Sequence, residues 1–190
     1  MRDLLTNNSD VAGKLQSYSM SVEAKQNIFT KQPNSIIKIV TPVVANIRSI
    51  FGKNSKEAET VNAYTTKIRG IKVAKPAVEA VSNSVSQSER SYGTMLQTFS
   101  DLIVALESLG ANYAPSNAEC TTINLKQKRD LATQINTKAT EDFGKLKIAR
   151  DSRITKYAEL SELCGRFKET VKAQYGTQSV EYKLVKGLKI

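Results

Sequence analysis

The sequence has no histidine and no tryptophan, and it contains only 2 cysteines and 4 prolines among 190 residues. Without histidine the commonest general base is missing, which excludes Ser-His-Asp, Cys-His and two-histidine-one-carboxylate sites within the chain. The chain also lacks a C-x-x-C pair and the glycine motifs that bind nucleotide phosphates. We therefore expect a protein that is not an enzyme and that has no cofactor, no metal and no small-molecule substrate.

Aromatic residues are also scarce, at 6% of the chain against 40% for hydrophobic residues as a whole. This balance favours a core of aliphatic side chains on helices, and the few Pro and Gly residues leave room for long uninterrupted helices. No stretch approaches the roughly 18 apolar residues of a membrane span, and the opening "MRDLLTNNSD" has no apolar signal core. We expect an all-α, soluble, cytoplasmic protein with reduced thiols.

The first third of the chain predicts short helices. Apolar residues at near-helical spacing indicate a first helix over residues 10–30, after a loose stretch over residues 1–9. The run "IIKIV" is ambiguous between helix and strand. Thr41 followed by Pro42 is typical of a helix start, because a proline at the first helical position loses no hydrogen bond.

One phrase, aromatic-Gly-x-x-Ser-x-Glu, occurs twice. Its residues are Phe51, Gly52, Ser55 and Glu57 in the first copy, and Tyr175, Gly176, Ser179 and Glu181 in the second. Glycine can end a helix in the left-handed conformation, serine can cap the next helix, and glutamate suits its positive end. Each copy predicts a helix–turn–helix corner, and the repetition suggests a duplicated unit or pseudo-symmetric ends. A DNA-reading role is disfavoured, because acidic Glu57 and Glu59 follow Ser55.

Heptad spacing dominates the middle of the chain and predicts an antiparallel coiled-coil hairpin over residues 76–150. Its first arm, Pro76 to Leu109, carries the seam Val78, Val81, Val85, Tyr92, Met95, Phe99, Leu102, Leu106 and Leu109, with polar Ser88 among them. Its second arm follows the turn "GANYAP" and starts at the capping box Ser116 to Glu119. The seam of this arm is Leu125, Ala132, Ile135, Ala139 and Leu146.

The pattern weakens at residues 151–153 and resumes up to Tyr175. Gly165 and the Asp151-Ser152 pair favour a break, although one continuous helix over residues 116–175 stays open. We expect one elongated helical domain over residues 1–190, with a short-helix head (1–75), the hairpin (76–150) and C-terminal helices (151–190) that pack back on the head. The final "KLVKGLKI" is amphipathic and is expected to dock on the protein or on a neighbouring copy.

The net charge is +10, and residues 122–190 hold 15 of the 28 Lys and Arg residues but only 8 of the 18 acids. The candidate phosphate-binding cations are Lys126, Lys128, Arg129, Lys138, Lys145, Lys147, Arg150, Arg153 and Lys156. Such a patch can hold nucleic acid without sequence preference. Aromatic residues for base stacking are not interleaved with it, and acids such as Asp130 and Asp151 dilute it. We favour a solvated, salt-bridged face.

Two further features carry a chemical alternative. Cys120 lies near a predicted helix start, where a thiol pKa can fall, but an inert small residue is favoured over a redox thiol. Cys164 falls on an apolar stripe and reads as core. Glu141 and Asp142 are the nearest approach to a carboxylate metal site, and we favour a solvated face for them.

The runs "LGANYAPSNAEC" and "VKAQYGTQSVEYKLVKGLK" resemble a group of uncharacterised helical bacterial proteins of about 200 residues that end in a Y-G-x-x-S-x-E-Y motif. The resemblance covers roughly residues 92–190 and rests on turn motifs. It implies a helical bacterial protein, and because the group has no assigned activity it implies no functional residues.

The leading functional hypothesis is a non-enzymatic structural or assembly protein that forms homo-oligomers through helical surfaces. The alternative is a basic helical protein that binds nucleic acid non-specifically, and an acidic protein surface is a further candidate partner. A membrane-active helical hairpin ranks last, because no long apolar segment supports it.

Overall fold

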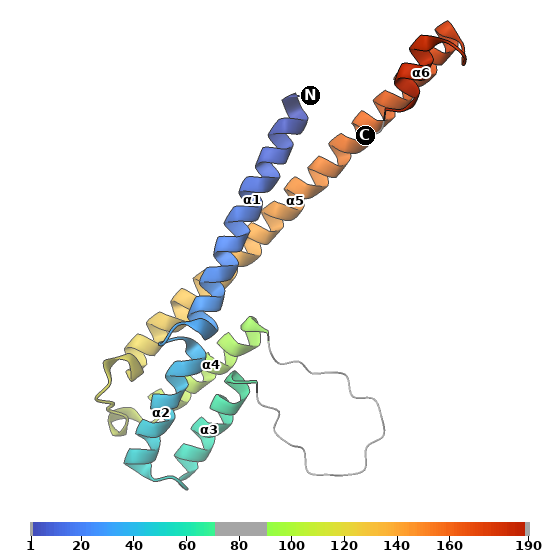
Figure 1. Cartoon of the computed structure of the whole chain (residues 1–190). Helices are drawn as coiled ribbons and strands as arrows, with labels where there is room; N and C mark the ends of the chain where they lie inside the picture. The colour runs from blue at the N-terminus through green and yellow to red at the C-terminus, as the bar shows by residue number, and fades with distance from the viewer. Residues whose placement is uncertain (1, 71–90, 189–190) are drawn as a thin grey trace, which may run out of the picture. The chain divides into compact units, whose positions relative to one another are not determined.

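The computed structural model describes residues 2–70 and 91–188, and within these ranges it contains helices and no strands. The expectation of an all-α protein is confirmed. The elements in chain order are α1 (Arg2–Gln26), η1 (Asn27–Lys31), α2 (Ile36–Phe51), α3 (Lys56–Ile68), α4 (Tyr92–Glu107), η2 (Gly110–Asn112), η3 (Ala118–Cys120), α5 (Thr122–Tyr175) and α6 (Val180–Lys186) (Figure 1). None of the described helices is both long enough and apolar enough to span a bilayer.

The chain forms two compact units. The central unit comprises residues 20–140, and the terminal unit comprises residues 1–19 together with residues 141–190. The long helices α1 and α5 each contribute residues to both units. The predicted head, hairpin and C-terminal segments do not follow these boundaries and stay predictions.

The start of the chain is helical from Arg2, so the prediction of a loose stretch over residues 1–9 was wrong. The α-helical part ends at Gln26, and a single π-helical turn, η1, continues the helix to Lys31, close to the expected end at residue 30. The side-chain amide of Asn8 donates to the Tyr157 hydroxyl at 3.0 Å, and Val11 is buried against Leu146. The polar sequence of α1 only weakly favours a helix. The helix is instead accompanied by contacts with α5, a segment far away in the chain.

Helix α2 begins at Ile36, and Pro42 lies inside it, so the predicted helix start at Thr41-Pro42 was wrong. Ser35 precedes the helix, and its carbonyl accepts from the amides of Lys38 and Ile39 at 2.9 Å each. The ambiguous run "IIKIV" is the first part of this helix. Ile36, Ile39 and Val40 are buried in the core, and this burial explains why the β-branched run is helical here.

The core of the central unit collects side chains from η1, α2, α3, α4 and the first turns of α5. Phe29 is fully buried and contacts the Tyr92 ring, with 4.6 Å between the ring centroids. Within the central unit α3 packs against both α2 and α4. Of the predicted hairpin seam, Phe99, Leu102, Leu106, Leu125 and Ala132 are buried in this core, whereas Tyr92, Met95, Leu109 and Ile135 pack at its edge.

The first arm of the predicted hairpin is described only from Ser91 onward, where α4 begins at Tyr92. Val78, Val81 and Val85 lie outside the described residues. The full coiled-coil hairpin over residues 76–150 therefore stays a prediction. The other two seam residues, Ala139 and Leu146, are buried on α5.

The predicted start of the second arm at Ser116 was wrong, and of the two alternatives for residues 151–153 the structure has the continuous helix. Ser116 caps no α-helix: Asn117 precedes the short η3, with its side chain accepting from the Glu119 amide at 3.0 Å, and α5 starts only at Thr122. No break occurs at residues 151–153, because α5 runs without interruption to Tyr175. Asp151 and Ser152 are solvent-exposed, where an uninterrupted helix tolerates polar residues of low helix propensity.

Candidate association surface

The two corners share one backbone geometry. Gly52 and Gly176 have φ of 92° and 83°, and their amides donate to the carbonyl four residues earlier at 3.0 Å and 2.9 Å. In each corner the serine three residues later accepts a hydrogen bond at 3.1 Å, Ser55 from the Ala58 amide and Ser179 from the Tyr182 amide. The local turn chemistry of the two corners is thus the same.

The two corners differ in what covers them. In the first corner Phe51 packs on the central core, and the inner residues of α3, Ala58 and Val61, are buried. In the second corner Tyr175 is 57% exposed, and the corresponding inner residues of α6, Tyr182 and Val185, are half-buried. The second corner therefore leaves more of its side chains in contact with solvent.

The outer face of α6 also differs from that of α3. Lys56 and Thr60 are the outer residues of α3, whereas Val180 and Leu184 occupy the same positions of α6 and are 69% and 74% exposed. Leu188, just beyond α6, is exposed as well, and its carbonyl accepts from the Lys168 ammonium group of α5. The outer face of α6 is therefore an exposed aliphatic stripe, whereas that of α3 is polar.

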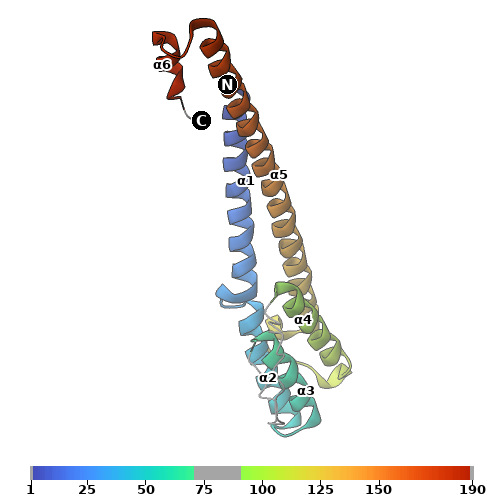
Figure 2. The same cartoon turned by 90° about the vertical axis from the view of Figure 1, so that its right-hand side faces the viewer.

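In the terminal unit α1 and α5 run antiparallel, because Asn8 meets Tyr157 while Tyr18 meets Phe143, with 5.5 Å between the last two ring centroids. Figures 1 and 2 both show the two helices side by side. The buried hydrophobic cluster between them consists of Val11, Leu146 and Ala149, with Tyr18 packed against it. This is a small core compared with that of the central unit.

One side of the α1–α5 pair exposes apolar residues of both helices, together with the cations Lys147 and Arg150 of α5. At about 100° per residue, Leu5, Asn8 and Leu15 fall within about 80° on α1. Phe143, Ile154 and Tyr157 likewise fall within about 80° on α5. The Asn8–Tyr157 hydrogen bond joins the two stripes, so they lie on the same side of the pair.

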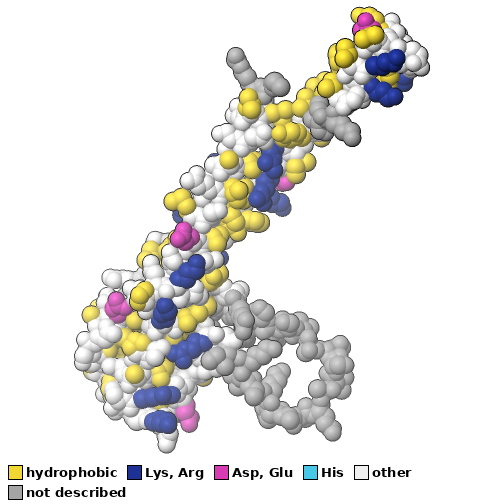
Figure 3. All heavy atoms as spheres, viewed as in Figure 1, with side chains coloured by type: hydrophobic (Ala, Val, Ile, Leu, Met, Phe, Trp, Pro, Cys, Tyr) yellow, Lys and Arg dark blue, Asp and Glu magenta, His cyan; other side chains and the backbone are white. Residues whose placement is uncertain are grey.

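We call this surface the open face and define it by its exposed apolar residues, Leu5, Leu15, Phe143, Ile154 and Tyr157. Their side chains are between 40% and 68% exposed. In the space-filling view, hydrophobic side chains reach the surface along these two helices (Figure 3). The open face is thus an apolar surface that the described part of the chain does not cover.

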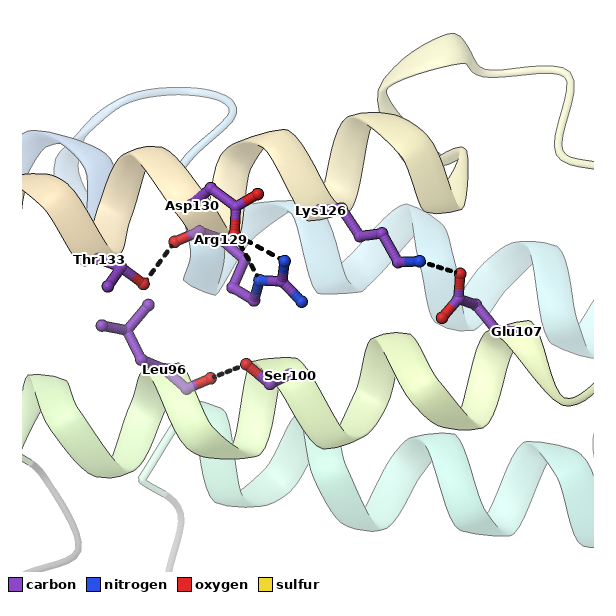
Figure 4. A network of polar contacts seen from close by, with 7 residues as sticks. All are labelled: Leu96, Ser100, Glu107, Lys126, Arg129, Asp130 and Thr133. Atoms are coloured by element: carbon purple, nitrogen blue, oxygen red, sulfur yellow. Dashed lines mark hydrogen bonds and ion pairs between the residues drawn. The ribbon is translucent and has the colours of Figure 1, made fainter.

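All nine predicted phosphate-binding cations lie on α5, but most already have partners. Lys126 pairs with Glu107 of α4, and Arg129 pairs with Asp130, with 2.6 Å between its Nη2 and the carboxylate (Figure 4). Lys128 donates to the Asn34 carbonyl at 2.7 Å. Lys145, Lys156 and Lys138 also interact with neighbours, the first two with Asp142 and Glu159 respectively.

The remaining cations, Lys147, Arg150 and Arg153, show no ion pair or hydrogen bond with any residue in the described ranges. Successive positions at about 100° per residue spread these three cations over about 120° of the α5 circumference. Arg153 is half-buried, whereas Lys147 and Arg150 are exposed. Of the nine predicted phosphate-binding cations, only this short group of three therefore remains without a partner in the described ranges.

The thiol and carboxylate candidates have ordinary structural surroundings. Cys120 is 1% exposed in η3, and burial together with the nearby Glu119 charge raises its pKa. Its carbonyl accepts from the buried Tyr113 hydroxyl at 2.8 Å, and burial raises the pKa of that phenol too. Cys164 is half-buried on α5.

Asp142 is 4% exposed and pairs with Lys145 at 3.8 Å, so a solvated face was the wrong expectation for this residue. Glu141 beside it is exposed. Across residues 2–70 and 91–188, no three acidic or cysteine side chains gather closely enough to hold a metal ion.

Sequence reasoning missed the open face, although its residues follow a helical period. Phe143 lies before the break that the sequence favours at residues 151–153, and Ile154 and Tyr157 lie after it. Projecting residues 141–160 as one helix would have placed these three on one side. The partner stripe, Leu5 to Leu15, needed the helical start of α1, which the sequence pattern did not predict.

Comparisons with protein-family models, with curated proteins and with solved structures found no match to this chain. The resemblance of residues 92–190 to a group of helical bacterial proteins therefore stays a prediction.

Proposed function

We propose that this chain is a non-enzymatic structural protein that assembles with copies of itself through helical surfaces, first of all through the open face. The observation that carries the proposal is the row of exposed apolar side chains along one side of the α1–α5 pair. A two-helix pair has one seam and needs a further layer to cover such a row. A second α1–α5 pair supplies that layer in the form of a four-helix arrangement.

The chemistry of the open face favours another copy of the same face. The α1 stripe, Leu5, Asn8 and Leu15, is uncharged, so it tolerates the desolvation that accompanies contact. The α5 stripe contains Arg150 beside its apolar residues, and a long cation can keep its charge in water while its stem covers apolar surface. Burial of an exposed aliphatic side chain contributes about 1.5–3 kcal/mol when complete.

Sedimentation velocity over a concentration series tests the proposal, with Ile154→Lys as the variant. Ile154 is 64% exposed, so a lysine there does not disturb the fold, whereas a charge in the middle of the contact weakens it. We expect the average mass of the variant to fall below that of the wild type at every concentration.

The matched control is Ile148→Lys. Ile148 lies on the same helix and is 71% exposed, but it points about 120° away from Ile154. We expect the control to keep the wild-type mass. A wild-type chain that remains a 20.9 kDa monomer at all concentrations contradicts the proposed function. Equal effects of the two substitutions would contradict the choice of surface.

A further inference from the structure

The stripe on the outside of α6 is a second apolar surface, separate from the open face. It consists of Val180 and Leu184, which lie about 40° apart on α6 at about 100° per residue, and of Leu188, which is exposed just beyond the end of the helix. The opposite side of α6, with Tyr182 and Val185, is half-buried. The α6 stripe is therefore the more exposed side of this helix.

The helix after the first corner, α3, provides a reference for this stripe, because its outer positions are exposed to solvent and polar. Both corners have the same glycine and serine geometry, so their following helices can be compared position by position. The outer positions hold Lys56 and Thr60 in α3, but Val180 and Leu184 in α6. Apolar residues at these positions are the mark of a surface that meets a partner.

The charges beside the stripe identify that partner. Glu181 lies about 60° to one side of Leu184, and Lys183 lies about 100° to the other side. Neither has an ion pair with any residue that the structure describes. If two α6 helices pack through their stripes in parallel about a two-fold axis, the Glu181 side of each copy faces the Lys183 side of the other. An antiparallel pair would instead place like charges together.

We propose that two copies of the chain pair their α6 helices in parallel through Val180, Leu184 and Leu188, with Glu181 of each copy beside Lys183 of the other. This inference rests on the proposed self-association and adds a second contact to it. Each copy then binds two neighbours, one through the open face and one through α6. Assemblies larger than a dimer follow from two such surfaces on one chain.

The experiment measures dimerisation by sedimentation in the full-length Ile154→Lys background, in which the open-face contact is removed. We expect this variant to remain a concentration-dependent dimer. Adding Val180→Lys and Leu184→Thr gives α6 the outer residues of α3. Because both positions are exposed, we expect unchanged helical circular dichroism and a dissociation constant at least about tenfold higher.

Charge exchange tests the parallel arrangement. In the same background, Glu181→Lys or Lys183→Glu alone should raise the dissociation constant about fivefold, and the two together should restore it. In an antiparallel pair each single exchange replaces one like-charge contact with another. Single exchanges without effect would therefore overturn the parallel arrangement.

Two outcomes overturn the α6 contact itself. If the wild type self-associates but Ile154→Lys is a monomer, α6 forms no contact and the proposed function stands. If Val180→Lys with Leu184→Thr abolishes sedimentation with phosphatidylglycerol vesicles but leaves dimerisation unchanged, the stripe meets anionic lipid instead. Failure of the proposed function has a different signature, because the wild type is then monomeric throughout.

Discussion

Gly52 and Gly176 are corresponding residues of two corners, each ending a helix with a positive φ, at 92° and 83°. Gly52, with ψ of 156°, lies in a backbone region that is essentially confined to glycine, and another residue there costs about 1–3 kcal/mol. No heavy atom lies within 4 Å of where a Cβ would stand in either glycine, so this cost is one of backbone conformation alone. Because Gly52 and Gly176 correspond, the same substitution can be made in both corners and its effects compared.

We predict that Gly52→Ala lowers the free energy of unfolding by about 1–3 kcal/mol, because the first corner is part of the central core. Gly176→Ala should instead increase hydrogen exchange in α6 and leave the central unit unchanged. Urea unfolding and residue-resolved hydrogen exchange measure the two effects.

The control is Gly165→Ala, inside α5, where φ is helical and a Cβ meets no atom within 4 Å. An alanine there should raise stability by about 0.5–1 kcal/mol. If Gly52→Ala left the free energy of unfolding unchanged, the conformation of this corner would not depend on its glycine.

At the two corners the helices end for reasons that lie within a few residues. These ends can therefore be predicted from the sequence. A glycine that can adopt positive φ and a serine whose side chain reaches the amide three residues on are local signals. The start of α2 at Ile36 is different. It depends on the burial of Ile36 and Ile39 in a core built from distant elements, while the local signal at Pro42 points elsewhere.

The open face depends on which two helices pair, and a single sequence does not contain that information. Leu5 and Ile154 are far apart in the chain, and their register is set by contacts between α1 and α5 such as those of Asn8 with Tyr157, of Tyr18 with Phe143 and of Val11 with Leu146. Each helix alone shows apolar residues over much of its circumference. Which of them face the partner helix and which remain exposed is decided by packing.

Pro42 lies in the interior of α2 and has no amide hydrogen to donate. Proline is about 3 kcal/mol less favourable than alanine at such a position. We predict that Pro42→Ala raises the free energy of unfolding by about 1–3 kcal/mol, as measured by urea unfolding. Pro33→Ala is the matched control, because Pro33 is exposed in the segment before α2 and should give little change. A destabilising Pro42→Ala would mean that the ring's packing outweighs the missing hydrogen bond.

The two thiols should differ in reactivity. Cys120 is buried with a raised pKa, whereas Cys164 is half-buried. With an aromatic disulfide reagent and no denaturant, we expect Cys164→Ser, which retains Cys120, to react more slowly than Cys120→Ser. The Cys120 rate should also climb at a higher pH than that of an ordinary thiol, because only the thiolate reacts. A fast reaction of Cys120 at neutral pH would restore the redox alternative.

The same pKa shift predicts a direction for stability. Above the ordinary thiol pKa the unfolded chain loses the Cys120 proton while the folded chain still holds it. The contribution of this thiol is therefore fully present below the unfolded pKa and is lost as the pH rises through the folded pKa. In Cys164→Ser, unfolding by urea at several alkaline pH values should show a steeper loss of stability than in the variant that lacks both cysteines.

Non-specific nucleic-acid binding, the alternative function, should be weak and only mildly dependent on salt. Of the nine candidate cations on α5, only Lys147, Arg150 and Arg153 show no partner in the described ranges, and three phosphate contacts give a log–log salt slope of about −3 at most. Fluorescence anisotropy with a labelled DNA duplex at increasing NaCl measures this slope. Lys147→Gln with Arg150→Gln should remove most of the residual affinity, whereas Lys126→Gln, which loses a cation already paired with Glu107, should not. A slope of about −6 or steeper would make nucleic acid the better-supported partner, because it would require the paired cations to release their carboxylates and bind phosphate.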